Sequence, residues 1–297
     1  MKTKEQKALL KKCRHRAEIP VTIVAILITV AVAGLIAFLF GSVGKNQQAE
    51  EILIEQFEYE QTDIDFAVKC GKYLLIVIAV FLFLKLLWEL FKNAGIAMVN
   101  DVPFEEKYDP KLYKEYREFC EKLGIREIPK LLLAADKENL ESTGITIKSE
   151  RYLRMDLSSV DIAGGTGDDD VIRFEVLHDL AHIAYHHYHY ALLIATVAAR
   201  WIPIVKSIYN RVMCYSADRL TAELISREEC ITVLLERYMQ SAYEPERREE
   251  YIKRLKDQKL TFTERLSAAL YNLTQDTPSY PDRIRALMDE RNHGRIV

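Results

Sequence analysis

The segment Phe174–His187 reads FEVLHDLAHIAYHH and follows a glycine-rich turn. We predict that it belongs to a helix starting near Val171. His178 and His182 are four residues apart, and residues at this spacing share one face of a helix, so both imidazoles can point at one ion. Such a pair also arises by chance on a polar helix face. Support for a metal site must therefore come from elsewhere in the chain.

Composition limits the classes of protein to consider. The chain has 297 residues, of which 49% are hydrophobic and 29% charged, and its net charge is −3. This length allows a membrane part and one globular domain, so we expect two domains at most. No stripe of Lys and Arg interleaved with aromatic residues appears later in the chain, and we expect no nucleic acid partner. Five scattered cysteines do not resemble a disulfide framework and indicate a reduced, cytosol-facing domain.

Two apolar segments predict transmembrane helices. The first, VTIVAILITVAVAGLIAFLF, runs from Val21 to Phe40 without a charge and is long enough to span a bilayer. A cleaved signal peptide is the alternative interpretation of this segment. The second, YLLIVIAVFLFLKLLWELF, starts at Tyr73. We expect the spans at about 21–41 and 73–91.

The distribution of charge predicts the orientation of this anchor. Seven Lys and Arg residues precede the first span, against three lysines in the acidic loop between the spans. By the positive-inside rule the N-terminus is cytoplasmic, the loop is external and the chain returns to the cytosol after the second span. Residues 1–98 are thus predicted to anchor the protein in the cell membrane, and residues 99–297 to form a cytosolic domain. The apolar segment Tyr190–Val205 is too short and broken for a third span, and we expect it on the core or at the membrane interface.

Local patterns predict a mainly helical α+β domain with a small sheet. Asp109–Ile125 begins with a capping aspartate and a proline and ends at Gly124, which is typical of an amphipathic helix. IPKLLLAAD from Ile128 and GITIKSERYLRMDLSS from Gly144 carry strand-like runs. Gly164–Asp170 (GGTGDDD) is predicted to be a turn that caps the next helix, with a phosphate or calcium loop as the alternative.

A second helix supports the histidine pair. YNRVMCYSADRLTAELI, from Tyr209, contains Cys214 and, four residues on, Asp218. In thermolysin-like zinc peptidases, the gluzincins, a second helix offers a glutamate ligand and, four residues later, an aspartate that hydrogen-bonds a ligand histidine. The chain resembles this arrangement, and specifically that of membrane metallopeptidases of the HtpX and CAAX-prenyl-protease type. Where these peptidases have the motif HExxH, this chain has HDxxH. The resemblance covers about Asp109–Leu287, with the motifs in the same order and YPDRIRAL from Tyr280 at the end.

The resemblance implies a zincin-like fold and a zinc-dependent metalloendopeptidase that cleaves membrane or misfolded proteins. The resemblance implies that His178, His182 and Cys214 are the Zn²⁺ ligands. It also implies that Asp179 is the general base and that Asp218 is the carboxylate that orients a ligand histidine. The polypeptide substrate would add to the edge strand ahead of the histidine helix, at Thr143, Gly144, Ile145 and Thr146. We therefore expect a polypeptide substrate and membrane lipid as the partners of this protein.

Two residues depart from the family pattern at the chemical centre. Asp179 replaces a base glutamate and is shorter by about 1.5 Å. Since a misplacement of about 1 Å can cost on the order of a hundredfold in rate, we expect weakened activity. Cys214 replaces a glutamate ligand; its thiolate can bind zinc, but a free cysteine is also commonly a small buried hydrophobe.

Two alternatives stay open. Glu175 lies one turn before His178 and competes as the third ligand, although a capping or surface role is the simpler interpretation. The alternative function is a catalytically inactive relative that keeps the fold to bind peptides or partner proteins.

Overall fold

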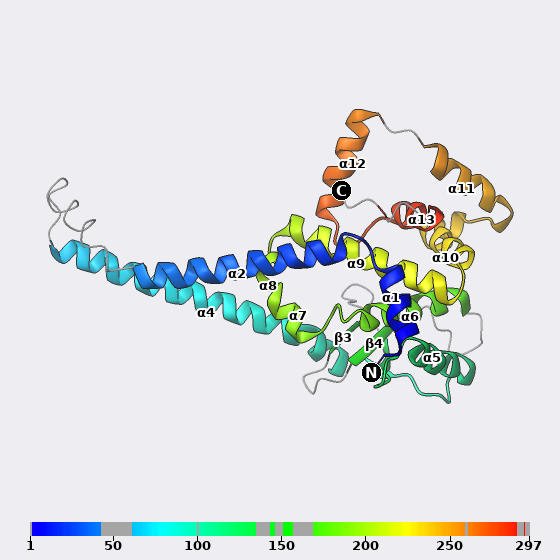
Figure 1. Cartoon of the computed structure of the whole chain (residues 1–297), viewed down its shortest axis with the longest axis horizontal. Coiled ribbons are helices and arrows are strands. Elements are labelled where there is room, and N and C mark those ends of the chain that lie inside the picture. The colour runs from blue at the N-terminus through cyan, green and yellow to red at the C-terminus, as the bar shows by residue number, and fades with distance from the viewer. Residues whose placement is uncertain are drawn as a thin grey trace.

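A globular part and a long helical hairpin make up the molecule (Figure 1). The computed structural model describes residues 2–42, 61–99, 101–134, 143–145, 151–156, 169–258, 261–289 and 294. The hairpin consists of α2 (Glu18–Ser42) and α4 (Gln61–Val99), which lie side by side. The other labelled helices and strands gather at one end of this hairpin.

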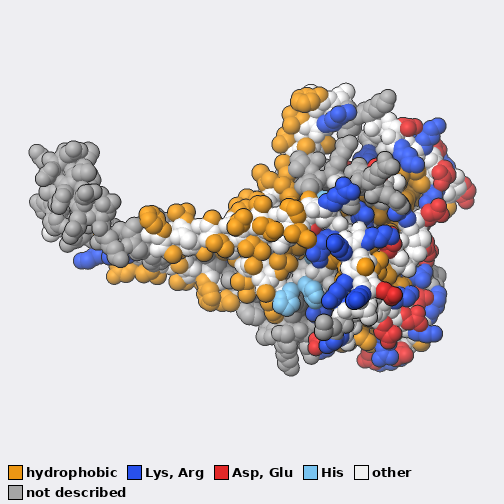
Figure 2. All heavy atoms as spheres, viewed as in Figure 1, with side chains coloured by type: hydrophobic (Ala, Val, Ile, Leu, Met, Phe, Trp, Pro, Cys, Tyr) orange, Lys and Arg blue, Asp and Glu red, His pale blue; other side chains and the backbone are white. Residues whose placement is uncertain are grey.

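Large apolar side chains cover the outside of the hairpin. Leu27 and Phe38 on α2 and Phe81 on α4 are all more than half exposed, and Figure 2 shows hydrophobic side chains along its length. Among the described residues, one helix, Glu18–Phe38, is long and apolar enough to cross a membrane, a property that a signal sequence near the N-terminus shares. Only 6% of its apolar window is buried, which differs from the core helix of a soluble protein.

The described part of the chain therefore contains one candidate membrane helix where two spans were predicted. The predicted second span, 73–91, lies inside the single helix α4. Part of its side chains lies outside the described residues. Of the predicted loop between the spans, residues 43–60 also lie outside them, whereas residues 61–72 form the first part of α4. The second span and the external loop stay predictions.

Helix α1 (Lys4–Cys13) belongs to the globular core, although it precedes the hairpin. A capping box starts this helix. Its last residue, Cys13, is buried in the same hydrophobic cluster as Tyr116. The hydroxyl of Tyr185 donates a hydrogen bond to the carbonyl of Leu10. The residues before α2 thus pack with the globular part, whereas the predicted domain division grouped them with the anchor.

The predicted small sheet is present, with strand order β1-β2-β4-β3. The strands are β1 (Val102–Pro103), β2 (Lys130–Ala134), β3 (Thr143–Ile145) and β4 (Arg151–Asp156). β2 and β4 are parallel, and the two outer pairs are antiparallel. The two-residue strand β1 was not predicted because it is too short to show alternation. β3 forms one edge of the sheet.

Capping residues set the limits of α5 (Pro110–Lys122). The Asp109 carboxylate accepts a hydrogen bond from the backbone N–H of Leu112. Beyond the helix, Gly124 has a φ of 66°, in the left-handed region that glycine adopts at low cost. The predicted helix, with its cap and its stop, is confirmed.

Two helices form the centre of the globular part: α6 (Asp169–Ala184) and α9 (Pro203–Leu224), which pack together. Leu177, Leu180 and Ala181 of α6 are fully buried. The remaining helices are α7 (Tyr190–Ala195), α8 (Val197–Arg200), α10 (Arg227–Met239), α11 (Arg248–Asp257), α12 (Phe262–Thr274) and α13 (Tyr280–Met288), with 3-10 turns at Gln240–Ala242 and Pro245–Arg247. The predicted mainly helical α+β class is confirmed.

The apolar segment Tyr190–Val205 is broken as predicted. It forms the short helices α7 and α8 and the start of α9, and both short helices pack against α2. Of the predicted glycine-rich turn Gly164–Asp170, residues 164–168 lie outside the described residues, and Asp169 and Asp170 are the first residues of α6.

Gly124 ends α5 in the left-handed conformation, beside Gln6 of α1. A Cβ at this position would lie 2.5 Å from Oε1 of Gln6, whose side chain amide donates to the carbonyl of Glu121. Gly124→Ala should lower the free energy of unfolding by about 1–2 kcal/mol because of the left-handed φ, as measured by denaturant unfolding in detergent. Gly34→Ala is the control, since a Cβ there meets no atom within 4 Å. Equal stability of both variants would contradict this role of Gly124.

Candidate metal centre

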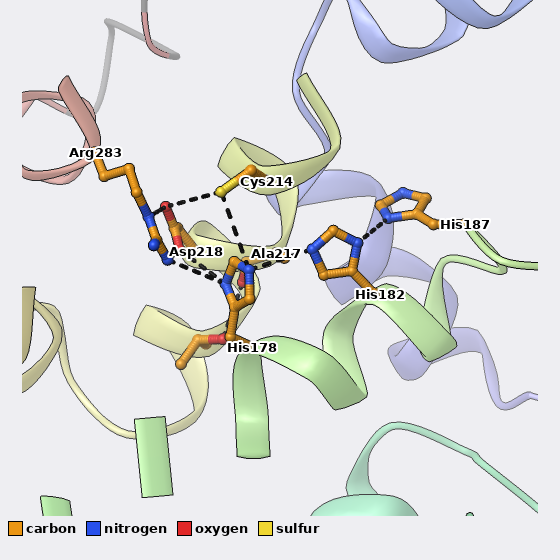
Figure 3. A network of polar contacts seen from close by, with 8 residues as sticks. His178, His182, His187, Cys214, Ala217, Asp218 and Arg283 are labelled. Carbon is orange, nitrogen blue, oxygen red and sulfur yellow. Dashed lines mark hydrogen bonds and ion pairs between the residues drawn. The ribbon is translucent and has the colours of Figure 1, made fainter. Parts of the chain in front are cut away.

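The two histidines of α6 point their Nε2 atoms at each other. His178 and His182 lie one helical turn apart, and their Nε2 atoms are 3.2 Å apart (Figure 3). Two nitrogen ligands of a tetrahedral zinc, each at 2.0–2.1 Å, are separated by about 3.3 Å. The pair therefore has the spacing of two ligands of one ion.

The other ring nitrogen of each histidine already has a partner. Nδ1 of His178 is 2.9 Å from Oδ1 of Asp218 on α9. Nδ1 of His182 is 2.9 Å from Nδ1 of His187. A carboxylate only accepts, so His178 donates through Nδ1 and carries a lone pair on Nε2, which accepts in the contact with His182. A metal-binding histidine uses this lone pair and donates through its other nitrogen in the same way.

Burial favours the neutral form of both imidazoles. Burial lowers the pKa of His178 in spite of the nearby Asp218 carboxylate. Burial and the charges of His178 and His187 lower the pKa of His182 well below its usual value. Because a metal binds the neutral ring, burial favours the ligand form of both side chains.

Cys214 lies above His178, one turn before Asp218 on α9. Its sulfur is 4.0 Å from Nε2 of His178 and 4.0 Å from Oδ2 of Asp218. Burial raises the pKa of this thiol to about 12, so a metal must displace its proton. Zinc ligands of the types Cys and His are about 3.5 Å apart, so the sulfur lies slightly farther out than coordination requires.

Among the described residues, His178, Cys214 and Asp218 each offer one ligand atom, and these three atoms all lie within 4.8 Å of one another. This group could hold a metal ion, although such clusters are not specific for zinc. His182 stands beside this group through its contact with His178 rather than inside it. Of the predicted set, His178 lies close to His182 and separately to Cys214, whereas the three do not form one group of ligand atoms.

Arg283 on α13 completes the cluster and was absent from the predicted site. Its Nε and Nη2 atoms lie 2.8 and 2.6 Å from the two carboxylate oxygens of Asp218, a two-point ion pair. Burial favours a neutral Asp218, but the charges of Arg283 and His178 outweigh it and lower the pKa of the carboxyl. The signal in the sequence was the segment YPDRIRAL, which contains this arginine.

A chain of polar contacts also leads from the site to the N-terminal segment. Nε2 of His187 lies 3.4 Å from Oε1 of Glu18, the first residue of α2. The hydroxyl of Ser216 donates to the same carboxylate. The orientation of His182 is therefore connected, through His187, to the helix that forms half of the hairpin.

The predicted base and the competing ligand occupy different surroundings. Asp179 is buried, and its charge adds to the effect of burial in raising the pKa of the Cys214 thiol. Glu175 forms an ion pair with Arg237 instead. The simpler interpretation of Glu175, a role other than metal binding, agrees with this contact.

Three of the four predicted substrate residues are described. Thr143, Gly144 and Ile145 form β3, the edge strand, which contacts α6. Thr146 lies outside the described residues. An edge strand has unpaired backbone groups to which a peptide can add.

Comparisons of the chain with family models, curated proteins and solved structures found no match. The resemblance in motif order therefore stays a prediction.

The ion pair of Asp218 should dominate the stability of this region. Arg283→Ala leaves a buried carboxylate unpaired and should lower the free energy of unfolding by about 3–5 kcal/mol. The control is Arg285→Ala, two residues away on the same helix. It removes more exposed contacts, an ion pair with Asp282 and hydrogen bonds to Leu255 and Gln258, and should cost less, about 1 kcal/mol. Denaturant unfolding measures both, and equal losses would show that Asp218 does not depend on Arg283.

Proposed function

We propose that this protein is a membrane-anchored, zinc-dependent metalloendopeptidase with a weakened active site. The observation that carries the proposal is the geometry of the histidine pair. The two Nε2 atoms are 3.2 Å apart, the spacing of two ligands of one ion, and each Nδ1 is engaged by a neighbour. The order of motifs along the chain, which resembles HtpX-type peptidases, gives the class of reaction.

Each residue has a proposed role. His178, His182 and Cys214 would hold zinc, which on binding acts as a Lewis acid and lowers the pKa of a bound water to about 7. Asp218 fixes the ring of His178, and Arg283 keeps Asp218 ionised. Asp179 would accept the proton of the attacking water, with its short side chain limiting the rate. The edge strand β3 would hold the substrate polypeptide in extended form.

The proposed location is a lipid bilayer, with α2 and α4 as the two spans. The exposed apolar surface of the hairpin supports this, because large exposed apolar patches mark contacts with lipid or partners. The packing of α1 supports an uncleaved N-terminus, since removal of residues 2–18 would take Cys13 and the Glu18 contact out of the globular part. The basic N-terminal residues favour a cytoplasmic site.

The second candidate is a catalytically inactive relative that binds peptides. The specific observation that favours it is the burial of the cluster: His182 and Cys214 are only 6% and 4% exposed. Asp179 and Cys214, which stand where the resembled peptidases have glutamates, also favour an inactive relative. Metal content and rescue of activity separate the two candidates.

Metal content tests the proposal first. Purified protein should contain about one zinc per chain by elemental analysis, and the double variant His178→Ala, His182→Ala should contain none. His189→Asn is the control, because His189 is exposed and caps α7, a role that asparagine can take over. Equal zinc in the double variant and the wild type would remove the metal centre.

Position 179 tests the chemistry. Asp179→Asn should abolish peptide cleavage, whereas Asp179→Glu should raise the rate, by up to about a hundredfold, because the carboxylate reaches about 1.5 Å farther. A fluorescence-quenched peptide library reports cleavage in detergent. Cleavage by Asp179→Glu but not by the wild type would support the inactive relative, and undiminished cleavage by Asp179→Asn would exclude Asp179 as the base.

A further inference from the structure

A second exposed apolar surface lies on α12, outside the hairpin and the metal centre. Phe262, Leu266 and Leu270 are 80%, 51% and 58% exposed. They are spaced four residues apart, so they form one stripe along the helix. Tyr271, 61% exposed, lies next to Leu270. The proposed peptidase activity gives this stripe no role.

The C-terminal end of α12 is held firmly on α9. The carbonyl of Asn272 accepts hydrogen bonds from the Ser207 hydroxyl at 3.0 Å and from Arg211 at 2.8 Å. Just after the helix, Asp276 forms an ion pair with Lys206 at 2.6 Å. The direction in which the stripe faces is therefore set by the globular part.

The region next to α12 is also apolar and leads back to the hairpin. Ile202 and Ile204, at the start of α9, are about half exposed, and the preceding α8 packs on α2. Figure 2 shows hydrophobic side chains continuing from the hairpin across this region to the helix at the top of the view. Where α8 ends, Lys85 of α4 lies 5.2 Å from the ring of Trp201. Tryptophan and lysine are typical of membrane interfaces.

We propose that α12 lies in the plane of the membrane interface, with its stripe inserted into the bilayer that the hairpin crosses. This inference rests on the proposed membrane anchor. In-plane amphipathic helices bury their apolar face about 5–10 Å into the boundary between headgroups and acyl chains. Continuity with the apolar surface of the hairpin favours lipid over a second copy of the chain. The globular part is then held at two points, which fixes the orientation of β3 and α6 relative to the bilayer.

Lipid quenching of a fluorophore tests this contact in the full-length protein. The background is Cys70→Ser, because the other four cysteines are buried. Single cysteines at Leu266→Cys, Val77→Cys and Glu249→Cys carry an environment-sensitive dye in nanodiscs that contain doxyl-labelled lipid. The dye at 77 is the positive control, because Val77 is exposed on the hairpin. The dye at 249 is the control for contact with water, because Glu249 is exposed on α11, away from the hairpin.

The dye at 266 should shift to the blue and lose fluorescence to the lipid quencher, as the dye at 77 does, while the dye at 249 does neither. A water-like, unquenched signal at 266 beside a quenched signal at 77 would overturn the α12 contact and leave the anchor standing. A blue shift at 266 without lipid quenching would assign the stripe to a protein partner and also overturn the proposal. An unquenched signal at 77 would overturn the anchor and this inference together, while the metal content would still test the peptidase site.

Discussion

The carboxylate of Asp218 connects three helices at one buried point. It lies on α9, accepts a hydrogen bond from His178 on α6 and is paired with Arg283 on α13. An unpaired buried charge is strongly unfavourable, so these three helices must keep their positions for the carboxylate to stay ionised. The same interaction fixes which nitrogen of His178 faces His182. Stability of the core and preparation of the site thus depend on one group.

The helix that leaves the globular part also touches the site. Glu18 starts α2 and lies against His187, which in turn contacts His182. The ring of His178 is held by Asp218 at the centre of the fold, and the ring of His182 is held by His187, which contacts the N-terminal segment. In the proposed function, the membrane helix and the metal centre would share a polar network, so the anchor would influence the position of the second ligand.

Local features of the sequence were predictable because they depend on neighbouring residues. The cap at Asp109, the stop at Gly124 and the turn between His178 and His182 each involve a few consecutive positions. Asp218 was also singled out, because its spacing from Cys214 resembles that in the gluzincins, and its contact with His178 agrees with the predicted orienting role. The contact of Arg283 with Asp218 joins residues 65 positions apart, and that of Tyr185 with Leu10 joins residues 175 apart. Pairing at such separations comes from packing, which periodicity does not encode, so Arg283 and the role of α1 were missed.

X-ray absorption at the zinc edge of the purified, zinc-loaded protein tests the central claim most directly. We predict a first shell with two nitrogens at about 2.0–2.1 Å and one sulfur at about 2.3 Å, with the sulfur lost in Cys214→Ser and a nitrogen lost in His182→Ala. A shell of oxygens alone, unchanged in both variants, would contradict the convergence of these side chains on one ion.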